Sequence, residues 1–210
     1  MFGDRVLILS PHTDDGELSA GGTILRLIED GKDVHYAAFS SCEKSVSEGF
    51  PRDILQKECL AATSHLGIPR ANTILLDYEV REFPRLRQEI LDSMISIKKE
   101  ISPDLVITPS SYDTHQDHQV IYNEAVRAFK KSSSIWGMEH PWNNLDFRTD
   151  IFVELTEGHV KKKIDALKKY ASQDDKDYFH EDYLRAHLLT RGMNTGARFA
   201  EVFECIRLRI

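Results

Sequence analysis

Cysteine is scarce in this chain, and long apolar runs are missing altogether. Only three of the 210 residues are cysteines, far apart in the sequence. Their odd number and spacing argue against both a disulfide framework and a cysteine-ligated zinc site. No apolar stretch approaches the roughly 20 residues that a membrane helix needs, and the first residues lack the basic and apolar build of a signal peptide. We therefore expect a soluble, cytoplasmic protein with reduced thiols and no membrane span.

The chain has no excess of basic residues, and it lacks the sequence fingerprints of dinucleotide-binding domains and of zinc proteases. The formal net charge is -7, and lysines and arginines are scattered apart from the run 161–163, so the sequence does not predict nucleic-acid binding. Neither the Gly-Xaa-Gly-Xaa-Xaa-Gly pattern of dinucleotide-binding domains nor the His-Glu-Xaa-Xaa-His pattern of zinc proteases occurs. We interpret Gly21 and Gly22 as sites of close helix-strand packing.

Short apolar runs alternate with longer helical patterns along the whole chain. Such alternation is typical of βαβ units around a mostly parallel sheet, and the length suits one core, so we predict a single α/β domain over 1–210. The predicted strands cover 5–10, 34–40, 73–77, 104–108, 150–155 and 202–208. The predicted helices cover 18–28, 52–66, 84–100, 119–131 and 157–170. The least regular segments are 41–51 and 132–148, and loops of that length are often functional.

A histidine and three carboxylates directly follow the first predicted strand, in the segment Pro11-His12-Thr13-Asp14-Asp15-Gly16-Glu17. Open α/β sheets keep their active sites beyond the C-terminal ends of the strands. Carboxylates that crowd together repel one another unless a cation lies among them. The segment therefore predicts a metal site within the first twenty residues.

A second polar cluster, Asp113-Thr114-His115-Gln116-Asp117-His118, follows the predicted strand 104–108. Either cluster alone would also fit turn and capping chemistry, but both lie where one sheet edge can bring them together. A catalytic zinc site typically has three protein ligands, which His12, one of the paired aspartates and one of His115 and His118 would supply. The other aspartate could then act as general base, without a serine or cysteine nucleophile. Such a ligand set suits iron(II) as well as zinc.

With these residues in view, the sequence resembles the PIG-L or LmbE-like deacetylase family. The first segment, with Ala20-Gly21-Gly22-Thr23-Ile24 behind it, is similar to the family's His-Pro-Asp-Asp-Xaa-Glu motif, and the second is similar to its His-Pro-Asp-His motif. Glu58, Arg191-Gly192 and Ala200-Glu201-Val202-Phe203 extend the similarity toward the end of the chain.

The resemblance implies a Rossmann-like three-layer fold, one divalent metal that is usually zinc, and hydrolysis of the N-acetyl group of an amino sugar or glycoconjugate. The residues that match the family's metal ligands are His12, Asp15 and His118. Asp14 matches the general base, His115 matches the group that stabilises the oxyanion, and Asp117 would orient a histidine. The resemblance also leaves room for a homo-oligomer. The alternatives are a metal hydrolase of another amide or acyl bond and a sugar-binding module without activity.

Two positions depart from the family pattern, and the substrate-binding residues are matched least well. Thr13 and Gln116 stand where the family has proline, and neither change removes a chemical group from the site. Arg52 is the only candidate near Glu58 for a substrate-binding arginine. Trp136 and Trp142, in the irregular segment 132–148, are further candidates because aromatic faces suit sugar rings.

Overall fold

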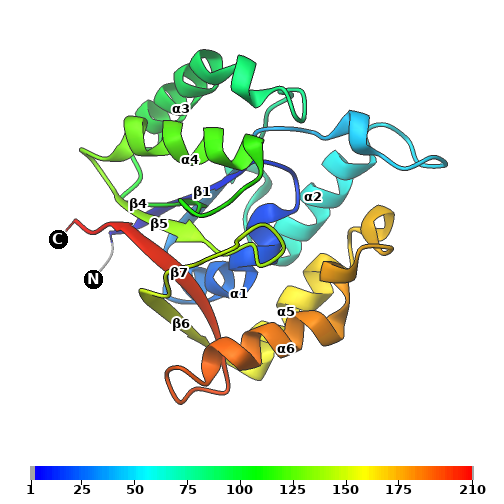
Figure 1. Ribbon diagram of the computed structural model, residues 1–210, viewed down its shortest axis with the longest axis vertical. Coiled ribbons are helices and arrows are strands. Elements are labelled where there is room, and N and C mark those ends of the chain that lie inside the picture. The colour runs from blue at the N-terminus through cyan, green and yellow to red at the C-terminus, as the bar shows by residue number, and fades with distance from the viewer. Residues whose placement is uncertain (1–2, 210) are drawn as a thin grey trace.

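A computed structural model describes residues 3–209, which build a seven-stranded sheet with helices on both faces (Figure 1). The strand order is β3-β2-β1-β4-β5-β7-β6. The parallel strands are β1 (Arg5–Ser10), β2 (Asp33–Ala38), β3 (Thr73–Leu75), β4 (Leu105–Pro109) and β5 (Ser134–Met138). Strand β7 (Phe199–Arg207) runs antiparallel to β5 and to the edge strand β6 (Ile151–Leu155). The predicted α/β class with a mostly parallel sheet is confirmed.

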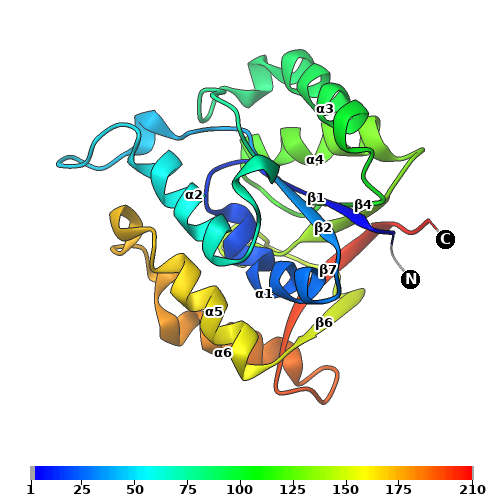
Figure 2. The same ribbon diagram turned by 180° about the vertical axis from the view of Figure 1, so that it is seen from behind.

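The helices form two layers because successive residues of a buried strand point to opposite faces. Val6 and Ile8 of β1 join the core under α1 (Asp15–Glu29), α2 (Ile54–His65) and α5 (Glu157–Leu167). Leu7 and Leu9 join the core under α3 (Arg87–Ile101) and α4 (Gln116–Phe129). Helix α6 (Glu181–Gly192) packs on β7 and α5, and Figure 2 shows this outer pair beside α1.

The sheet reverses its winding direction at β1. The chain passes from β1 to β2 and β3 on one side, and then returns to place β4 on the other side of β1. In open α/β sheets, such a switch point leaves a crevice beyond the carboxyl ends of the two neighbouring strands. Both polar clusters of the sequence follow these two strands, so the fold brings them to the same crevice.

Two elements were not predicted from the sequence. Strand β5 lies inside the segment 132–148 that we expected to be irregular. It was missed because its five residues include Gly137 and are too few to show a period. Helix α6 was missed because its apolar positions do not gather on one clear face. Pro84 lies in a short 3-10 turn, Phe83–Arg85, just before α3.

The packing role predicted for the glycine pair is confirmed at Gly22. A Cβ atom there would lie 2.4 Å from Leu155 Cδ1 of β6 and 3.1 Å from Glu201 Oε1 of β7. Gly21 faces Lys163 of α5 instead, with 3.0 Å to its Cγ. In the described part of the chain, no helix combines the length and apolarity needed to cross a membrane.

Candidate metal centre and active site

Three potential metal-binding atoms converge where the loops after β1 and β4 meet. His12 Nδ1 lies 3.1 Å from Asp15 Oδ2, His118 Nε2 lies 3.2 Å from the same oxygen, and the two nitrogens are 3.3 Å apart. A tetrahedral zinc ion with bonds of about 2.0 Å needs ligand atoms about 3.3 Å apart. The three atoms therefore fit one face of a zinc tetrahedron.

Each of the two histidines is oriented by a buried aspartate. Asp117 Oδ2 lies 3.1 Å from His12 Nε2, and Asp113 Oδ2 lies 2.7 Å from His118 Nδ1. A carboxylate that accepts a hydrogen bond from one ring nitrogen fixes the proton there and leaves the other nitrogen free to bind a metal. The three candidate ligand atoms, and the aspartates that contact the far ring nitrogens, thus both suit a divalent cation.

His115 presents a hydrogen-bond donor to the same crevice. His115 is the N-cap residue of α4, and its Nδ1 accepts a hydrogen bond from the Asp117 backbone N–H at 3.2 Å. The proton of the neutral ring therefore lies on Nε2. Burial, with the nearby His118 and His12, lowers the pKa of His115 to about 4. The ring is therefore neutral near pH 7 and can donate from Nε2.

Asp14 lies beside the ligands and lines the cleft, one residue before the start of α1. Burial, followed by the neighbouring Asp15 carboxylate, raises the pKa of Asp14 to about 6. A carboxyl group with such a pKa can both take up and release a proton near neutral pH. Asp15 thus contacts both histidines, whereas Asp14 lines the cleft.

A buried hydrogen-bond network holds the loop that carries Asp14. Tyr170 Oη lies 2.6 Å from the Thr13 carbonyl oxygen and 2.8 Å from Glu17 Oε1, and Tyr36 contacts the same two groups. Tyr170 has one hydroxyl proton for two contacts, and Thr13 O can only accept, so a protonated Glu17 supplies the missing hydrogen. Burial raises the pKa of Glu17 to about 8, which agrees with a neutral acid.

The metal centre opens into a cleft of about 360 Å³. Trp142 lines it and is 38% exposed, stacked on Tyr178 with ring centroids 4.3 Å apart and planes at 16°. The segment with Tyr178 is tied to α2 by Glu58, which accepts from the Ser172 backbone N–H at 2.9 Å. The cleft wall therefore combines residues from distant parts of the chain.

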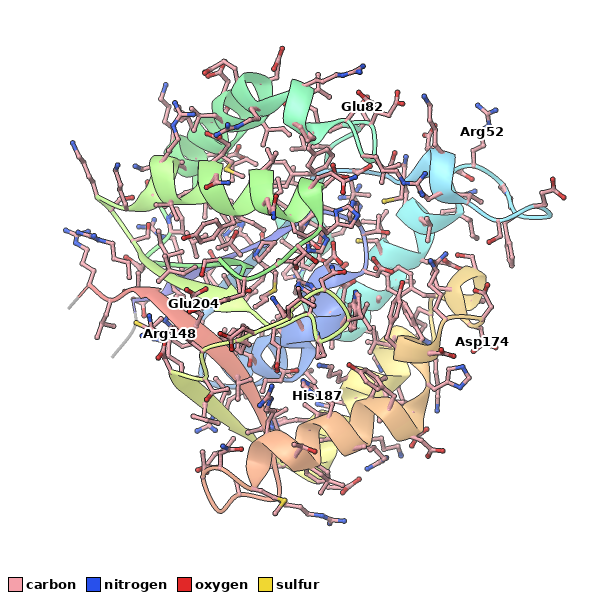
Figure 3. All side chains as sticks on the ribbon, in the orientation of Figure 1. Arg52, Glu82, Arg148, Asp174, His187 and Glu204 are labelled. Carbon is pink, nitrogen blue, oxygen red and sulfur yellow. The ribbon has the colours of Figure 1, made fainter. Side chains whose placement is uncertain are left out.

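Two residues predicted to bind substrate lie elsewhere. Trp136 lies in β5, is 3% exposed and packs against Phe203, so it belongs to the core. Arg52 is exposed and does not line the cleft, and Figure 3 shows it at the outer edge of the molecule. The first assignment fails because the unrecognised strand β5 buries Trp136. The second fails because α2 begins at Ile54 and the preceding turn faces solvent.

Sequence reasoning missed several residues of the site. His140 is fully buried, with Nδ1 3.1 Å from Asp113 Oδ2 and Nε2 3.7 Å from Asp15 Oδ1. Its place just after β5 would have been the signal, had that strand been recognised. Asp113 was within a recognised motif but had no assigned role. Tyr178, in a short turn without periodicity, gave no signal.

Comparisons with known proteins identify relatives of this chain. The model of the PIG-L family, described as GlcNAc-PI de-N-acetylase, matches residues 7–129. The diacetylchitobiose deacetylase of Thermococcus kodakarensis is 26% identical over 221 residues, which cover 94% of this chain and 81% of that protein.

Two solved structures share the fold. The N,N'-diacetylchitobiose deacetylase of Pyrococcus horikoshii superposes with a TM-score of 0.80 at 23% identity, covering 96% of this chain and 83% of the other. The 4-carboxy-2-hydroxymuconate hydratase of Pseudomonas putida KT2440 reaches 0.79 at 20% identity, covering 99% and 98%. The fold is thus shared by proteins whose names denote different reactions.

Proposed function

We propose that this chain, which belongs to the GlcNAc-PI de-N-acetylase (PIG-L) family, hydrolyses the N-acetyl group of a small amino sugar to acetate and a free amine. The observation that carries the proposal is the convergence of His12 Nδ1, Asp15 Oδ2 and His118 Nε2 within 3.3 Å of one another. Asp14 and His115 line the cleft beside them. The enzyme would act in the cytoplasm.

His12, Asp15 and His118 would hold one divalent ion, for which zinc is our first choice and iron(II) or another divalent metal the alternative. When bound, such an ion polarises an acyl carbonyl and makes water a better nucleophile. The two aspartates behind the histidines would accept hydrogen bonds from the far ring nitrogens and so direct the other nitrogens toward the ion.

Asp14 would act as the general base and then as the general acid. Its carboxylate takes a proton from the attacking water and later delivers it to the nitrogen of the leaving amine. The same group can perform both transfers because its pKa, raised to about 6 by burial and Asp15, lies near neutral pH.

His115 would stabilise the negative charge that develops on the acyl oxygen. Its Nε2–H can donate to that oxygen, because Nδ1 already accepts from Asp117 N–H. Since burial lowers its pKa to about 4, the ring keeps this neutral form near pH 7.

The stacked pair Trp142 and Tyr178 would bind the apolar face of the sugar ring. Aromatic faces offer contact area with little loss of conformational freedom, and Asn143 lies on the same wall to bond hydroxyl groups.

A second candidate is a hydrolase of another amide or acyl bond at the same centre, because the converging His12, Asp15 and His118 atoms would serve such a bond equally well. The test is a panel of N-acetylated amino sugars, N-acetylated amino acids and simple esters, assayed for product release by the metal-loaded protein. Turnover confined to N-acetyl sugars supports the proposal. Preferred turnover of another acyl compound would replace it.

A further inference from the structure

Two basic side chains line the cleft without a carboxylate partner. In the described part of the chain, no carboxylate oxygen lies within 4.0 Å of the side-chain nitrogens of Arg81 or Lys176, although Asp14 and Asp15 line the same cleft. Lys44, Lys57 and Arg85 do not line the cleft, and each has a carboxylate partner. Their ion pairs are Lys44–Glu79 at 2.5 Å, Lys57–Asp53 at 2.7 Å and Arg85–Glu82 at 3.2 Å. The cleft thus keeps two cationic groups available for a ligand.

Lys176 is aimed into the cleft from an otherwise acidic run. In the segment Asp174-Asp175-Lys176-Asp177 only the lysine lines the cleft, and Figure 3 shows Asp174 on the outer side of its loop. Its Nζ lies 6.0 Å from the centre of the Tyr178 ring, which is itself stacked on Trp142. The charge therefore lies beside the aromatic pair that we assign to the sugar.

Arg81 occupies a backbone position that a glycine would fill with less strain. Its φ angle is +72°, a conformation that costs a side-chain-bearing residue about 1–2 kcal/mol. The backbone N–H donates to Asp117 Oδ2 at 2.6 Å, a bond that glycine could make equally well. What arginine adds at this position is a cationic side chain on a residue that lines the cleft.

We propose that the substrate is an N-acetylated amino sugar that also carries an oxyanion, a carboxylate or a phosphate, and that Arg81 and Lys176 bind this group. The inference rests on the proposed deacetylase function. A chain with net charge -7 and aspartates on the floor of its cleft repels anionic ligands. Two unpaired cations at the cleft wall offset that repulsion and make charge-assisted hydrogen bonds that a neutral sugar cannot accept as strongly.

The test compares three substrates that share one acetamido sugar. They are the methyl glycoside of N-acetylglucosamine, its carboxymethyl glycoside and its 6-phosphate. We expect kcat/KM for at least one anionic compound to exceed that of the neutral glycoside about tenfold or more. The favoured anion distinguishes carboxylate from phosphate recognition.

The variants Lys176→Met and Arg81→Gly should each lower the anionic-to-neutral ratio of kcat/KM about tenfold, while Lys176→Arg keeps most of it. The ratio is the readout because Lys176 also lowers the pKa of Asp14, which would affect all three substrates alike. Lys57→Met, on the exposed side of α2, is the control and should leave the ratio unchanged.

A ratio near one, or variants that slow all three substrates equally, would overturn the inference and leave the deacetylase proposal intact. If none of the three compounds is hydrolysed, the proposed function fails instead. Calorimetric titration of the same compounds into metal-loaded Asp14→Asn protein then decides the inference, because tighter binding of an anionic compound supports it and equal binding contradicts it.

Discussion

Asp14 and Asp15 are neighbours in the chain but have different tasks in our account. Asp15 Oδ2 contacts both ligand histidines, whereas Asp14 lines the cleft. We predict that Asp14→Asn binds metal normally and loses about 10²- to 10⁴-fold in kcat, because it lacks only the general base. Asp15→Asn should lose metal first. Metal analysis and single-substrate kinetics on both variants check this, and an exchange of the two phenotypes would reverse the assignments.

The two tryptophans proposed from the sequence should respond differently to truncation. Trp142→Ala removes a cleft wall, so we expect KM to rise about three- to tenfold with metal content intact. Trp136→Ala removes a core side chain and should lower the free energy of unfolding by about 3–5 kcal/mol. Kinetics and denaturant titration separate the two effects. An unchanged KM in Trp142→Ala would remove that residue from the substrate site.

Glu17 should tolerate loss of its charge but not loss of its hydrogen bonds. Glutamine can replace a neutral acid between Tyr36 and Tyr170, so Glu17→Gln should unfold within about 1 kcal/mol of the wild type. Glu17→Ala removes one hydrogen-bond partner from each of the two buried tyrosine hydroxyls and leaves a cavity, so it should cost about 2–4 kcal/mol. Equal losses in both variants, measured by denaturant titration, would show that the ionised form stabilises the loop.

At the scale of elements, helix α1 depends on its contacts with β6, β7 and α5. Glu201 accepts from the Gly22 and Thr23 backbone N–H groups at 2.9 and 2.6 Å, and Lys163 donates to Glu201 and to the Leu18 carbonyl oxygen. The buried pair Lys163 and Glu201 thus holds the first half of the helix that begins at Asp15 in place. Glu201 therefore supports the candidate metal site from a distance.

Gly22→Ala tests this packing. Although alanine favours helices by about 1 kcal/mol, a Cβ atom 2.4 Å from Leu155 Cδ1 must push β6 aside, so we expect a net loss of about 1–3 kcal/mol. Gly158→Ala in α5 is the matched control, because the nearest atom to its Cβ is 3.5 Å away. A Gly22→Ala protein as stable as the control would show that close approach is not needed here.

Strands β1 and β4, and with them both ligand loops, could be predicted because buried parallel strands are continuous apolar runs. Strand β5 could not, since Ser134–Met138 is short and contains a glycine. That single omission hid the burial of Trp136 and the place of His140. Local patterns thus predicted which loops meet at the candidate metal centre but misjudged residues whose surroundings come from other strands.

At the scale of the whole molecule, the reversal of strand order at β1 joins ligands about a hundred residues apart. The rule that sites lie at such switch points made the convergence of the two polar clusters predictable. The rest of the cleft was not, because Lys176, Tyr178 and Arg81 come from turns whose place depends on long-range packing. Sequence periodicity carries no information on such contacts.

The central claim, that one divalent ion held by His12, Asp15 and His118 supports deacetylation, is tested most directly by metal titration. Chelator-treated protein is titrated with zinc, with iron(II) in parallel, while acetate release from the methyl glycoside of N-acetylglucosamine and its 6-phosphate is measured. We predict that activity is absent at first, rises linearly to one equivalent of metal per chain and then levels off, and that His118→Ala shows no such rise. Full acetate release by the metal-free protein, or an unchanged titration of His118→Ala, would contradict the account.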